Sequence, residues 1–454
     1  MFKCSACETT TAKWSGKCLK CEAWRTLEEI PDEPKQKKGL RGGGSGSHGG
    51  FLNVGEPIEL RLVSASDAPG ARGRLLSKIS SVDELLGGGL VPGSLVLLAG
   101  EPGIGKSTLV MQIAIAARGV LYISGEESAE QVGLRTHRLD NNKTADVKFI
   151  GTTDFAHVDG AIRKYKPSLA IVDSVQTMRH PDIASEAGSV AQVRAVANAL
   201  MELANQTGVP VIIIGHVTKD GSVAGPKTLE HLVDVVLALE GERSDRLRFL
   251  RCFKNRFGPT DEVAVLEMLE TGLQPVADPS GLLLEERSLP VPGSVVTCLM
   301  DGNRPLLVEI QALTSRTTFG FPQRRAQGVD VGRLQILLAV LGRRMGLPVD
   351  QYDVFVNVVG GIQADEPAAD LAICMAIASS IAEKTIPQSV LAFGEVGLSG
   401  EIRKIKQADK RLKEAERQGF KFALIPQMKN LPTLKTLKVA PVTDIKTVLD
   451  KIDK

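Results

Sequence analysis

A nine-residue glycine-rich segment, Gly100 to Thr108 (GEPGIGKST), constrains this chain more than any other feature. It fits the pattern G-x-x-x-x-G-K-[ST], follows an apolar run of strand length at Ser94–Ala99, and precedes apolar residues at helical spacing. Glycines let backbone N–H groups close around phosphate oxygens, and the start of the following helix adds partial positive charge. The segment therefore predicts a site for a nucleoside triphosphate.

Each part of this loop has an expected role in holding ATP. Lys106 is expected to reach the β- and γ-phosphates, and the Ser107 hydroxyl is expected to ligate Mg²⁺. A glycine-rich turn without a ligand is the alternative, which the flanking strand and helix patterns disfavour. The expected nucleotide contacts are Gly100, Glu101, Pro102, Gly103, Ile104, Gly105, Lys106, Ser107 and Thr108.

The length of 454 residues is too great for one hydrophobic core and suggests about three domains. A net charge of +2 means that any nucleic-acid surface must be a local patch. No apolar run has membrane-spanning length, and the first residues lack the form of a signal peptide, so we expect a cytoplasmic protein. Seven cysteines in that compartment favour metal ligands or free thiols over disulfides.

Residues 1–30 hold two C-x-x-C pairs that predict a zinc ribbon. Four thiolates suit tetrahedral Zn²⁺, and metal binding would fold a module too short to have a core of its own. A redox role is the alternative for a single pair, but two pairs in tandem favour the metal. The expected ligands are Cys4, Cys7, Cys18 and Cys21.

A change of composition separates this ribbon from the rest of the chain. Residues 31–56 are basic and then rich in glycine and serine, which predicts a flexible linker whose lysines could also touch phosphates. Residues 57–288 alternate apolar runs of strand length with helical stretches, which predicts a parallel sheet covered on both faces. Ligands of such sheets bind beyond the carboxyl ends of the strands.

Polar residues stand at the ends of three of these predicted strands. Asp173 closes the run LAIVD and is expected to hold the Mg²⁺ shell. Glu126 and Glu127 follow the run VLYISG, and either carboxylate could orient the attacking water. His216 follows VIIIG and could sense the γ-phosphate. A solvated acid or a hydrogen-bonded strand-end histidine is the alternative at these positions.

The motifs GGGLVPGSLVLLAGEPGIGKST, LYISGEES and IVDS resemble the RecA/DnaB-type ATPase core. Together with the four-cysteine ribbon and the pentapeptide KNRFG at 254–258, they resemble the RadA (Sms) family of bacterial DNA-repair proteins over essentially the whole chain. The resemblance favours Glu126 over Glu127. It implies a DNA-dependent ATPase, a homo-oligomer that is a hexameric ring, and single- and double-stranded DNA and the RecA recombinase as partners.

The resemblance also gives KNRFG a role, because this segment lies at the subunit boundary in the family. Lys254 and Arg256 are then expected to reach a neighbour's triphosphate and offset charge on the γ-phosphoryl oxygens. A local salt bridge is the alternative. Two loops, 178–189 and 218–227, occupy the positions of the DNA loops of RecA-like proteins and offer Arg179, Lys219 and Lys227 to phosphates.

Residues 289–454 resemble the α+β proteolytic domain of Lon. Ala368 stands where the family has its nucleophilic serine, and Asp409 stands where it has its lysine. A serine–lysine dyad needs both groups, so we expect an inactive scaffold that serves DNA binding or oligomerisation. The basic residues that could line a DNA channel are Arg316, Arg324, Arg325, Arg333, Arg343, Arg344, Lys404, Lys406, Lys410, Arg411 and Lys413.

Four functional hypotheses follow. The first is a ring-shaped DNA motor that drives branch migration of recombination intermediates, and the second is a non-motor strand-exchange protein that forms ATP-dependent filaments. The third is an ATP-dependent protease, which Ala368 and Asp409 oppose. The fourth is a signalling ATPase of the circadian-clock type, which leaves the zinc ribbon unexplained.

Overall fold

The computed structural model describes residues 2–4, 7, 9–11, 17–18, 21, 23, 27–29, 73–140, 145–216, 226–241, 246–285, 287, 289–318, 320–429 and 431–452. The chain divides into two compact units, 1–62 and 63–454. The predicted linker 31–56, the residue Lys219 and the side chain of Lys227 lie outside the described residues. None of the helices in the described ranges is long and apolar enough to cross a membrane.

The first unit contains a small antiparallel sheet with the strand order β2-β1-β3. Its strands are β1 (Phe2–Cys4), β2 (Thr10–Thr11) and β3 (Leu27–Glu29). Strand β1 is central and pairs with both neighbours. Because Cys4 ends this central strand, the sheet fixes the first of the four cysteines that were predicted to bind zinc.

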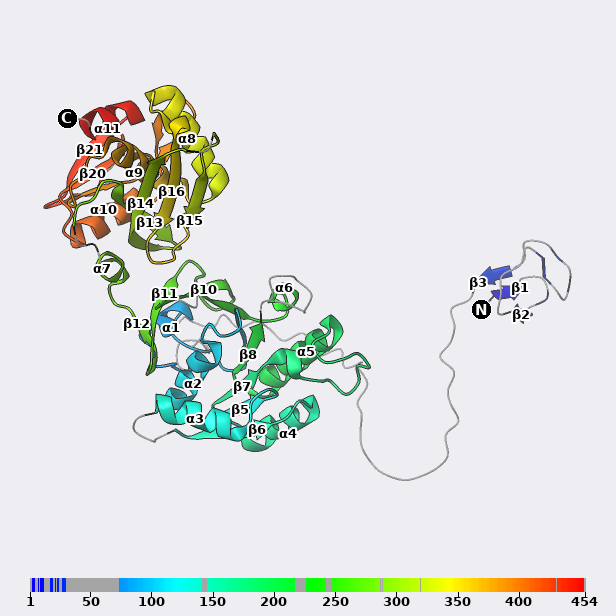
Figure 1. The fold of residues 1–454 in the computed structure, drawn as a ribbon. Helices are drawn as coiled ribbons and strands as arrows, with labels where there is room; N and C mark the ends of the chain where they lie inside the picture. The colour runs from blue at the N-terminus through cyan, green and yellow to red at the C-terminus, as the bar shows by residue number, and fades with distance from the viewer. Residues whose placement is uncertain are drawn as a thin grey trace. The chain divides into compact units, whose positions relative to one another are not determined.

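The second unit begins with a nine-stranded sheet of order β12-β11-β10-β9-β4-β8-β7-β5-β6 (Figure 1). The six strands from β9 to β6 in this order are parallel, and β10, β11 and β12 add an antiparallel extension. The bounds are β4 (Leu95–Gly100), β5 (Val120–Ser124), β6 (Val147–Gly151), β7 (Leu169–Asp173), β8 (Val211–His216), β9 (Val235–Glu240), β10 (Leu247–Asn255), β11 (Val263–Leu269) and β12 (Gly272–Pro275).

Helices cover both faces of this sheet, as the apolar runs predicted. One core joins α1 and α2 to one face, and a second core joins α4 and α5 to the other. The parallel α/β fold is therefore confirmed. The helices are α1 (Ser80–Leu85), α2 (Lys106–Ala117), α3 (Ala129–Leu139), α4 (Phe155–Tyr165), α5 (Val190–Thr207) and α6 (Pro226–Leu229).

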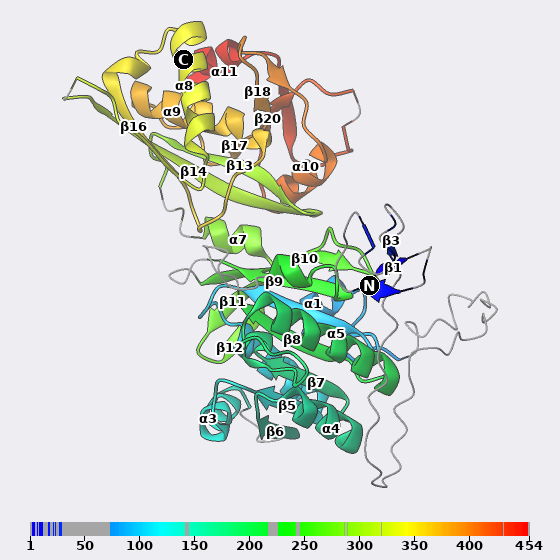
Figure 2. The same cartoon turned by 90° about the vertical axis from the view of Figure 1, so that its right-hand side faces the viewer.

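A seven-stranded sheet of order β15-β16-β14-β13-β17-β20-β21 forms the C-terminal part (Figure 2). Strands β13, β14 and β16 coincide with the apolar runs SVVTCLM, PLLVEIQAL and YDVFVNV of the sequence. The bounds are β13 (Ser294–Asp301), β14 (Arg304–Arg316), β15 (Arg324–Gln327), β16 (Tyr352–Val358), β17 (Val390–Ala392), β20 (Phe422–Pro426) and β21 (Lys438–Val442), with a separate pair β18 (Glu395–Val396) and β19 (Ile402–Arg403).

The two faces of this sheet are covered by different numbers of helices. Helices α8, α9 and α11 share a core with one face of β13, β14 and β16. Helix α10 packs on the other face, in a core that includes Leu307 from the first half of β14. The second half of β14 is therefore covered on one face only. The helices are α7 (Pro279–Leu284), α8 (Val331–Met345), α9 (Asp370–Ala382), α10 (Ala408–Arg417) and α11 (Ile445–Ile452).

Candidate nucleotide site

The glycine-rich loop joins β4 to α2, as its flanking patterns predict, and its glycines are required by close contacts. A Cβ on Gly100 would lie 2.6 Å from the Leu239 carbonyl oxygen. Gly105 has φ of 117° and directly precedes the helix. Glu101, Pro102 and Gly103 are exposed, Ile104 is buried, and Ser107 and Thr108 are half-buried in the first helical turn. The loop thus presents the amide-rich start of α2 to solvent.

Lys106 lies folded over its own loop. Its ammonium donates to the carbonyl oxygens of Gly100 at 2.8 Å and Glu101 at 2.9 Å, and the side chain is buried. Burial lowers the pKa of Lys106 to about 8, against the opposing effect of the Asp173 and Glu126 carboxylates. An anionic ligand in the loop would raise this pKa again, since phosphate oxygens are stronger partners for the ammonium than carbonyls.

Asp173 ends β7 as predicted, and a residue that the sequence analysis missed holds it in place. The Tyr122 hydroxyl donates to Asp173 Oδ2 at 2.6 Å inside the sheet. Burial, followed by the Asp173 charge, raises the pKa of this hydroxyl far above its usual range, so it stays a donor. Hydroxyl and carboxylate oxygens suit Mg²⁺, so Ser107 and Asp173 are chemically suited to hold that ion. A tyrosine inside the buried run VLYIS was the available signal.

Glu126 meets two partners from neighbouring strand ends. The Ser174 hydroxyl donates to Glu126 Oε1 at 2.5 Å, and His216 Nε2 lies 3.6 Å from the same oxygen. The contact with His216, together with the hydrogen bond from Ser174, lowers the pKa of the Glu126 carboxyl. The structure therefore brings together two of the predicted residues, Glu126 and His216, and adds Ser174, for which the sequence predicted no role.

Glu127 binds a different partner, so its carboxylate is not available to orient a water beside the nucleotide. Arg135 on α3 binds both of its carboxylate oxygens, at 2.5 Å and 2.7 Å. Such a bidentate pair fixes the orientation of the carboxylate. Glu126, in contrast, interacts electrostatically with Lys106 of the phosphate loop. The geometry therefore favours Glu126 over Glu127 as the carboxylate beside the nucleotide.

Lys254 and Arg256 of the KNRFG segment lie away from their own phosphate loop. Lys254 pairs with Val236 on β9, which in turn pairs with Leu97, so the segment lies beside the first residues of β4. The phosphate loop begins at the opposite end of that strand, about 10 Å further along at 3.3 Å per residue. The two cations therefore stand at the amino edge of the parallel sheet, while the nucleotide loop stands at its carboxyl edge.

Local contacts hold both cations at this edge. The Lys254 ammonium donates to the carbonyl oxygens of Glu230 at 2.7 Å and Val233 at 2.8 Å. Burial and the neighbouring Arg256 lower the pKa of Lys254. Arg256 Nη1 lies 3.1 Å from Asp234 Oδ1, and its side chain is 56% exposed. The local salt bridge is thus present within one chain, and the exposed guanidinium remains accessible to another molecule.

The four predicted zinc ligands converge in the first unit. The sulfur atoms of Cys4 and Cys21 lie 3.7 Å apart, those of Cys7 and Cys18 lie 3.6 Å apart, and all four lie within 4.8 Å of one another. Four thiolates at 2.3 Å around tetrahedral Zn²⁺ would be separated by about 3.8 Å. The cluster therefore fits a zinc ion, which the thiolates would hold as a structural centre.

The residues aligned with the Lon dyad do not form a nucleophilic pair. Ala368 is buried in a single 3-10 turn before α9, and Asp409 is exposed on α10. The interior beside them holds an ion pair instead, in which Arg411 binds both oxygens of Glu366 at 2.8 Å and 2.6 Å. Arg411 is 1% exposed.

Contacts within the domain occupy three of the arginines of the predicted DNA channel. Arg411 is enclosed with Glu366, and Arg333 binds the buried carboxylate of Asp370. Arg324 donates to the carbonyl oxygens of Val349 at 2.6 Å and of Tyr352. These three arginines were proposed as phosphate contacts, but Arg411 is buried, and the half-buried Arg333 and Arg324 already have partners within the domain. Arg179 in the first predicted DNA loop is exposed.

Comparison with known proteins gives matches along the chain. Residues 66–222 match the family described as AAA domain, and residues 333–429 match the family described as subunit ChlI of Mg-chelatase. The DNA repair protein RadA of Halalkalibacterium halodurans is 43% identical over 100% of this chain and 97% of that protein. RadA of Bacillus subtilis is 45% identical over 94% and 92%, and RadA of Pseudomonas aeruginosa is 42% identical over 100% and 98%. A crystal structure of the RadB recombinase covers 44% of this chain and 99% of that chain at 26% identity, with a TM-score of 0.36.

Proposed function

The chain belongs to the RadA family of DNA repair proteins, and from that premise we propose that it is an ATPase of DNA repair and recombination that works as a ring-shaped motor. The ring would encircle DNA and drive branch migration of recombination intermediates. The match of residues 66–222 to an AAA domain and the geometry of the phosphate loop support ATP as the fuel.

In the proposed hydrolysis step, each group at the carboxyl edge of the sheet has one role. Glu126 orients a water for in-line attack on the γ-phosphorus and accepts a proton from it, while the bond from that phosphorus to the β–γ bridging oxygen breaks to give ADP and phosphate. Lys106 leaves its loop carbonyls and binds the β- and γ-phosphate oxygens. Mg²⁺, when held by Ser107 and Asp173, supplies charge neutralisation. His216, in contact with Glu126, is placed to respond when the γ-phosphate leaves.

One observation carries the multi-subunit part of the proposal, namely the position of the KNRFG segment. Lys254 and Arg256 stand at the amino edge of the sheet and their own phosphate loop at the carboxyl edge. Cations so placed could act on a triphosphate only if it were bound by a neighbouring copy. Head-to-tail contacts of this kind generate closed rings when the rotation between copies closes.

Mixing two inactive variants tests this arrangement. Lys106→Ala removes the phosphate-loop amine and Lys254→Ala removes the neighbour's cation, so each variant alone is expected to hydrolyse no ATP. In a random one-to-one mixture, about a quarter of the interfaces combine an intact loop with an intact Lys254, and activity should return to about that fraction. A mixture that stays inactive, or full activity of Lys254→Ala alone, would refute the shared site.

The form of the assembly separates the motor from its main alternative. Electron microscopy with a non-hydrolysable ATP analogue and forked DNA is expected to show closed rings around DNA. Open helical filaments would favour a non-motor strand-exchange protein instead. We further propose that residues 289–454 form an inactive Lon-like scaffold and that residues 1–30 form a zinc ribbon that contacts a partner, with the RecA recombinase as the candidate.

A further inference from the structure

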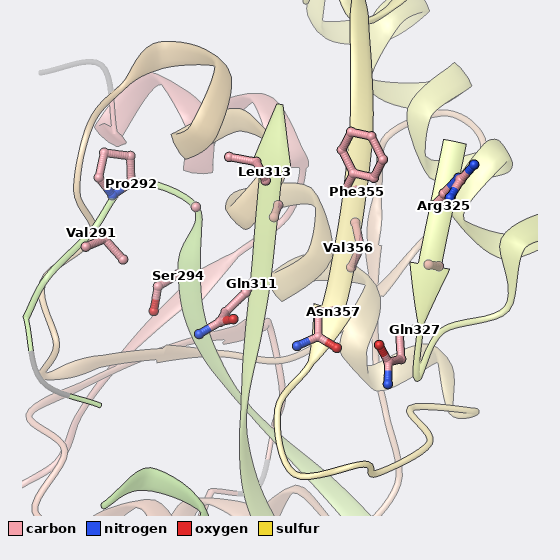
Figure 3. Close-up of a pocket in the computed structure, with 13 residues that line it drawn as sticks. Val291, Pro292, Ser294, Gln311, Leu313, Arg325, Gln327, Phe355, Val356 and Asn357 are labelled. Carbon is pink, nitrogen blue, oxygen red and sulfur yellow. The ribbon is translucent and has the colours of Figure 1, made fainter. Parts of the chain in front are cut away.

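The second half of β14 and its neighbours β16 and β15 present an uncovered sheet face with an ordered pattern of side chains (Figure 3). Leu313, Phe355 and Arg325 are paired across the three strands and form one row. Gln311, Asn357 and Gln327 are paired in the same way two residues along, and form a second row. Because side chains alternate between the faces of a sheet, both rows project from the same face.

Burial shows which face this is. The alternate residues Ala312, Val354 and Val356 are buried in the core with α8 and α9. Leu313, in contrast, is 67% exposed. The six side chains of the two rows line a cavity of about 580 Å³, which the segment 291–294 closes on one side. A cavity of this size can accept a nucleotide or a small molecule.

The charges around this cavity leave one cation without a counter-ion. The Glu309 carboxylate beside it already accepts hydrogen bonds from Ser294 and from Gln311, the latter at 3.1 Å, and pairs with Arg287. Asp353, at the other end of the face, accepts from Thr317 and Gln323.

Unlike the Glu309 and Asp353 carboxylates, the Arg325 side chain has no partner within the described part of the domain. Across the part of the chain that the structure describes, its guanidinium has no hydrogen bond or ion pair. The face thus combines an available positive charge with the half-buried ring of Phe355.

We propose that this face binds single-stranded DNA by stacking an unpaired base on Phe355. The ring supplies a stacking surface that accepts any base, and the Arg325 guanidinium beside it suits both the base plane and the phosphate backbone. The row of three amides offers donors and acceptors together, which matches the mixed edges of nucleobases.

The same chemistry disfavours a second copy of the chain as the occupant. Burying three adjacent amides against another protein surface is costly unless each finds its own partners. Interfaces between copies have apolar centres, whereas half of this face is made of amides. The inference rests on the proposed function, in which branch migration produces an unpaired strand for the ring to hold.

Two substitutions at one position separate stacking from simple apolar contact. Phe355→Leu keeps an apolar side chain but removes the ring, while Phe355→Tyr keeps the ring. Binding of fluorescein-labelled oligo(dT) is measured by anisotropy, with a duplex of equal length in parallel. Phe355→Leu should weaken oligo(dT) binding about fivefold to a hundredfold, and Phe355→Tyr should bind as the wild type does. Duplex binding and DNA-free ATP hydrolysis should stay unchanged in both.

A matched control and an assembly measurement complete the test. Phe422, on β20 and lining a different cavity, is also partly exposed, so Phe422→Leu should leave oligo(dT) binding unchanged. Equal oligo(dT) binding by Phe355→Leu and wild type would overturn the inference, as would a change in oligomer mass by light scattering, which would make this face an interface between copies. Failure of the proposed function would look different, because the wild type itself would then neither bind duplex nor hydrolyse ATP.

Discussion

Arg256 and Asp234 lie 3.1 Å apart at the amino edge of the parallel sheet, but the two residues have unequal structural roles. The other oxygen of Asp234 accepts a hydrogen bond, at 3.0 Å, from the buried backbone N–H of Leu95. Leu95 is the first residue of β4, the strand that leads to the phosphate loop. Asp234 therefore supports the ATPase sheet directly. Arg256 contributes only an exposed ion pair to Asp234.

This difference predicts opposite effects of two substitutions. Arg256→Gln removes a largely exposed ion pair and should change the free energy of unfolding by less than about 1 kcal/mol. If Arg256 acts on a neighbour's triphosphate, hydrolysis should nevertheless fall by about 10³-fold. Asp234→Ala leaves the Leu95 N–H unpaired and should cost about 1–3 kcal/mol of stability. Urea unfolding and phosphate release measure the two quantities. Loss of stability in Arg256→Gln with normal hydrolysis would show a purely local salt bridge.

The adjacent glutamates provide a second matched pair. Glu126→Gln should retain nucleotide binding but lose hydrolysis by about 10²-fold or more, because the amide cannot act as a base for the attacking water. Glu127→Gln should retain hydrolysis and lose up to about 1 kcal/mol of stability, because it weakens the pair with the partly exposed Arg135. Steady-state phosphate release and fluorescent-nucleotide binding distinguish the two. Reversed effects would move the catalytic role to Glu127.

Patterns along the chain were sufficient to predict the main elements of this fold. The run LAIVD is apolar throughout because β7 is buried on both faces, and GEPGIGKST needs a strand before it and a helix after it. The four cysteines were predictable because their chemistry depends on residue type and spacing alone. Such patterns involve residues close together in the chain, so they can be recognised from the sequence alone.

Contacts between distant segments were not predictable in the same way. Tyr122 reads as one apolar residue among others until β5 and β7 pair and place its hydroxyl on Asp173. Arg411 reads as a surface cation on a charged helix, and only the packing of α10 shows that Glu366 encloses it. The resemblance favoured Glu126 over Glu127, but the physical reason for that choice, the pair between Glu127 and Arg135, is seen only in the folded chain. Side-chain partners follow from tertiary packing, which residue spacing does not contain.

The cysteine cluster predicts a measurable metal content. Cys4→Ser replaces a buried thiolate at the end of the central strand β1, so the remaining three ligands should hold zinc far less tightly. Metal analysis should find about one zinc per chain in the wild type and less than about 0.2 in the variant. ATP hydrolysis without DNA should be unchanged, because residues 1–62 form a separate compact unit. Equal zinc in both proteins would contradict the assignment of these ligands.

Lys106 makes nucleotide binding dependent on protons. Burial sets its pKa at about 8 in the free protein, below the ordinary 10.5. Between these two values the unfolded chain binds more protons than the folded one, so the contribution of Lys106 to stability rises with pH through this window and is constant below about pH 8. Bound phosphates should raise the pKa again, so nucleotide binding at pH 9 should take up about one proton per site.

Calorimetric titration with a non-hydrolysable ATP analogue, in buffers of different ionisation enthalpy, measures this uptake directly. Lys106→Arg is the matched control, because a guanidinium is charged at every pH used and has no proton to gain. The wild type should show heats that vary with the buffer at pH 9, and the arginine variant should not. The same uptake in both proteins would assign the proton to another group. Because the free Lys106 ammonium donates to the carbonyl oxygens of Gly100 and Glu101, the absence of any uptake would mean that these carbonyls already keep it fully charged.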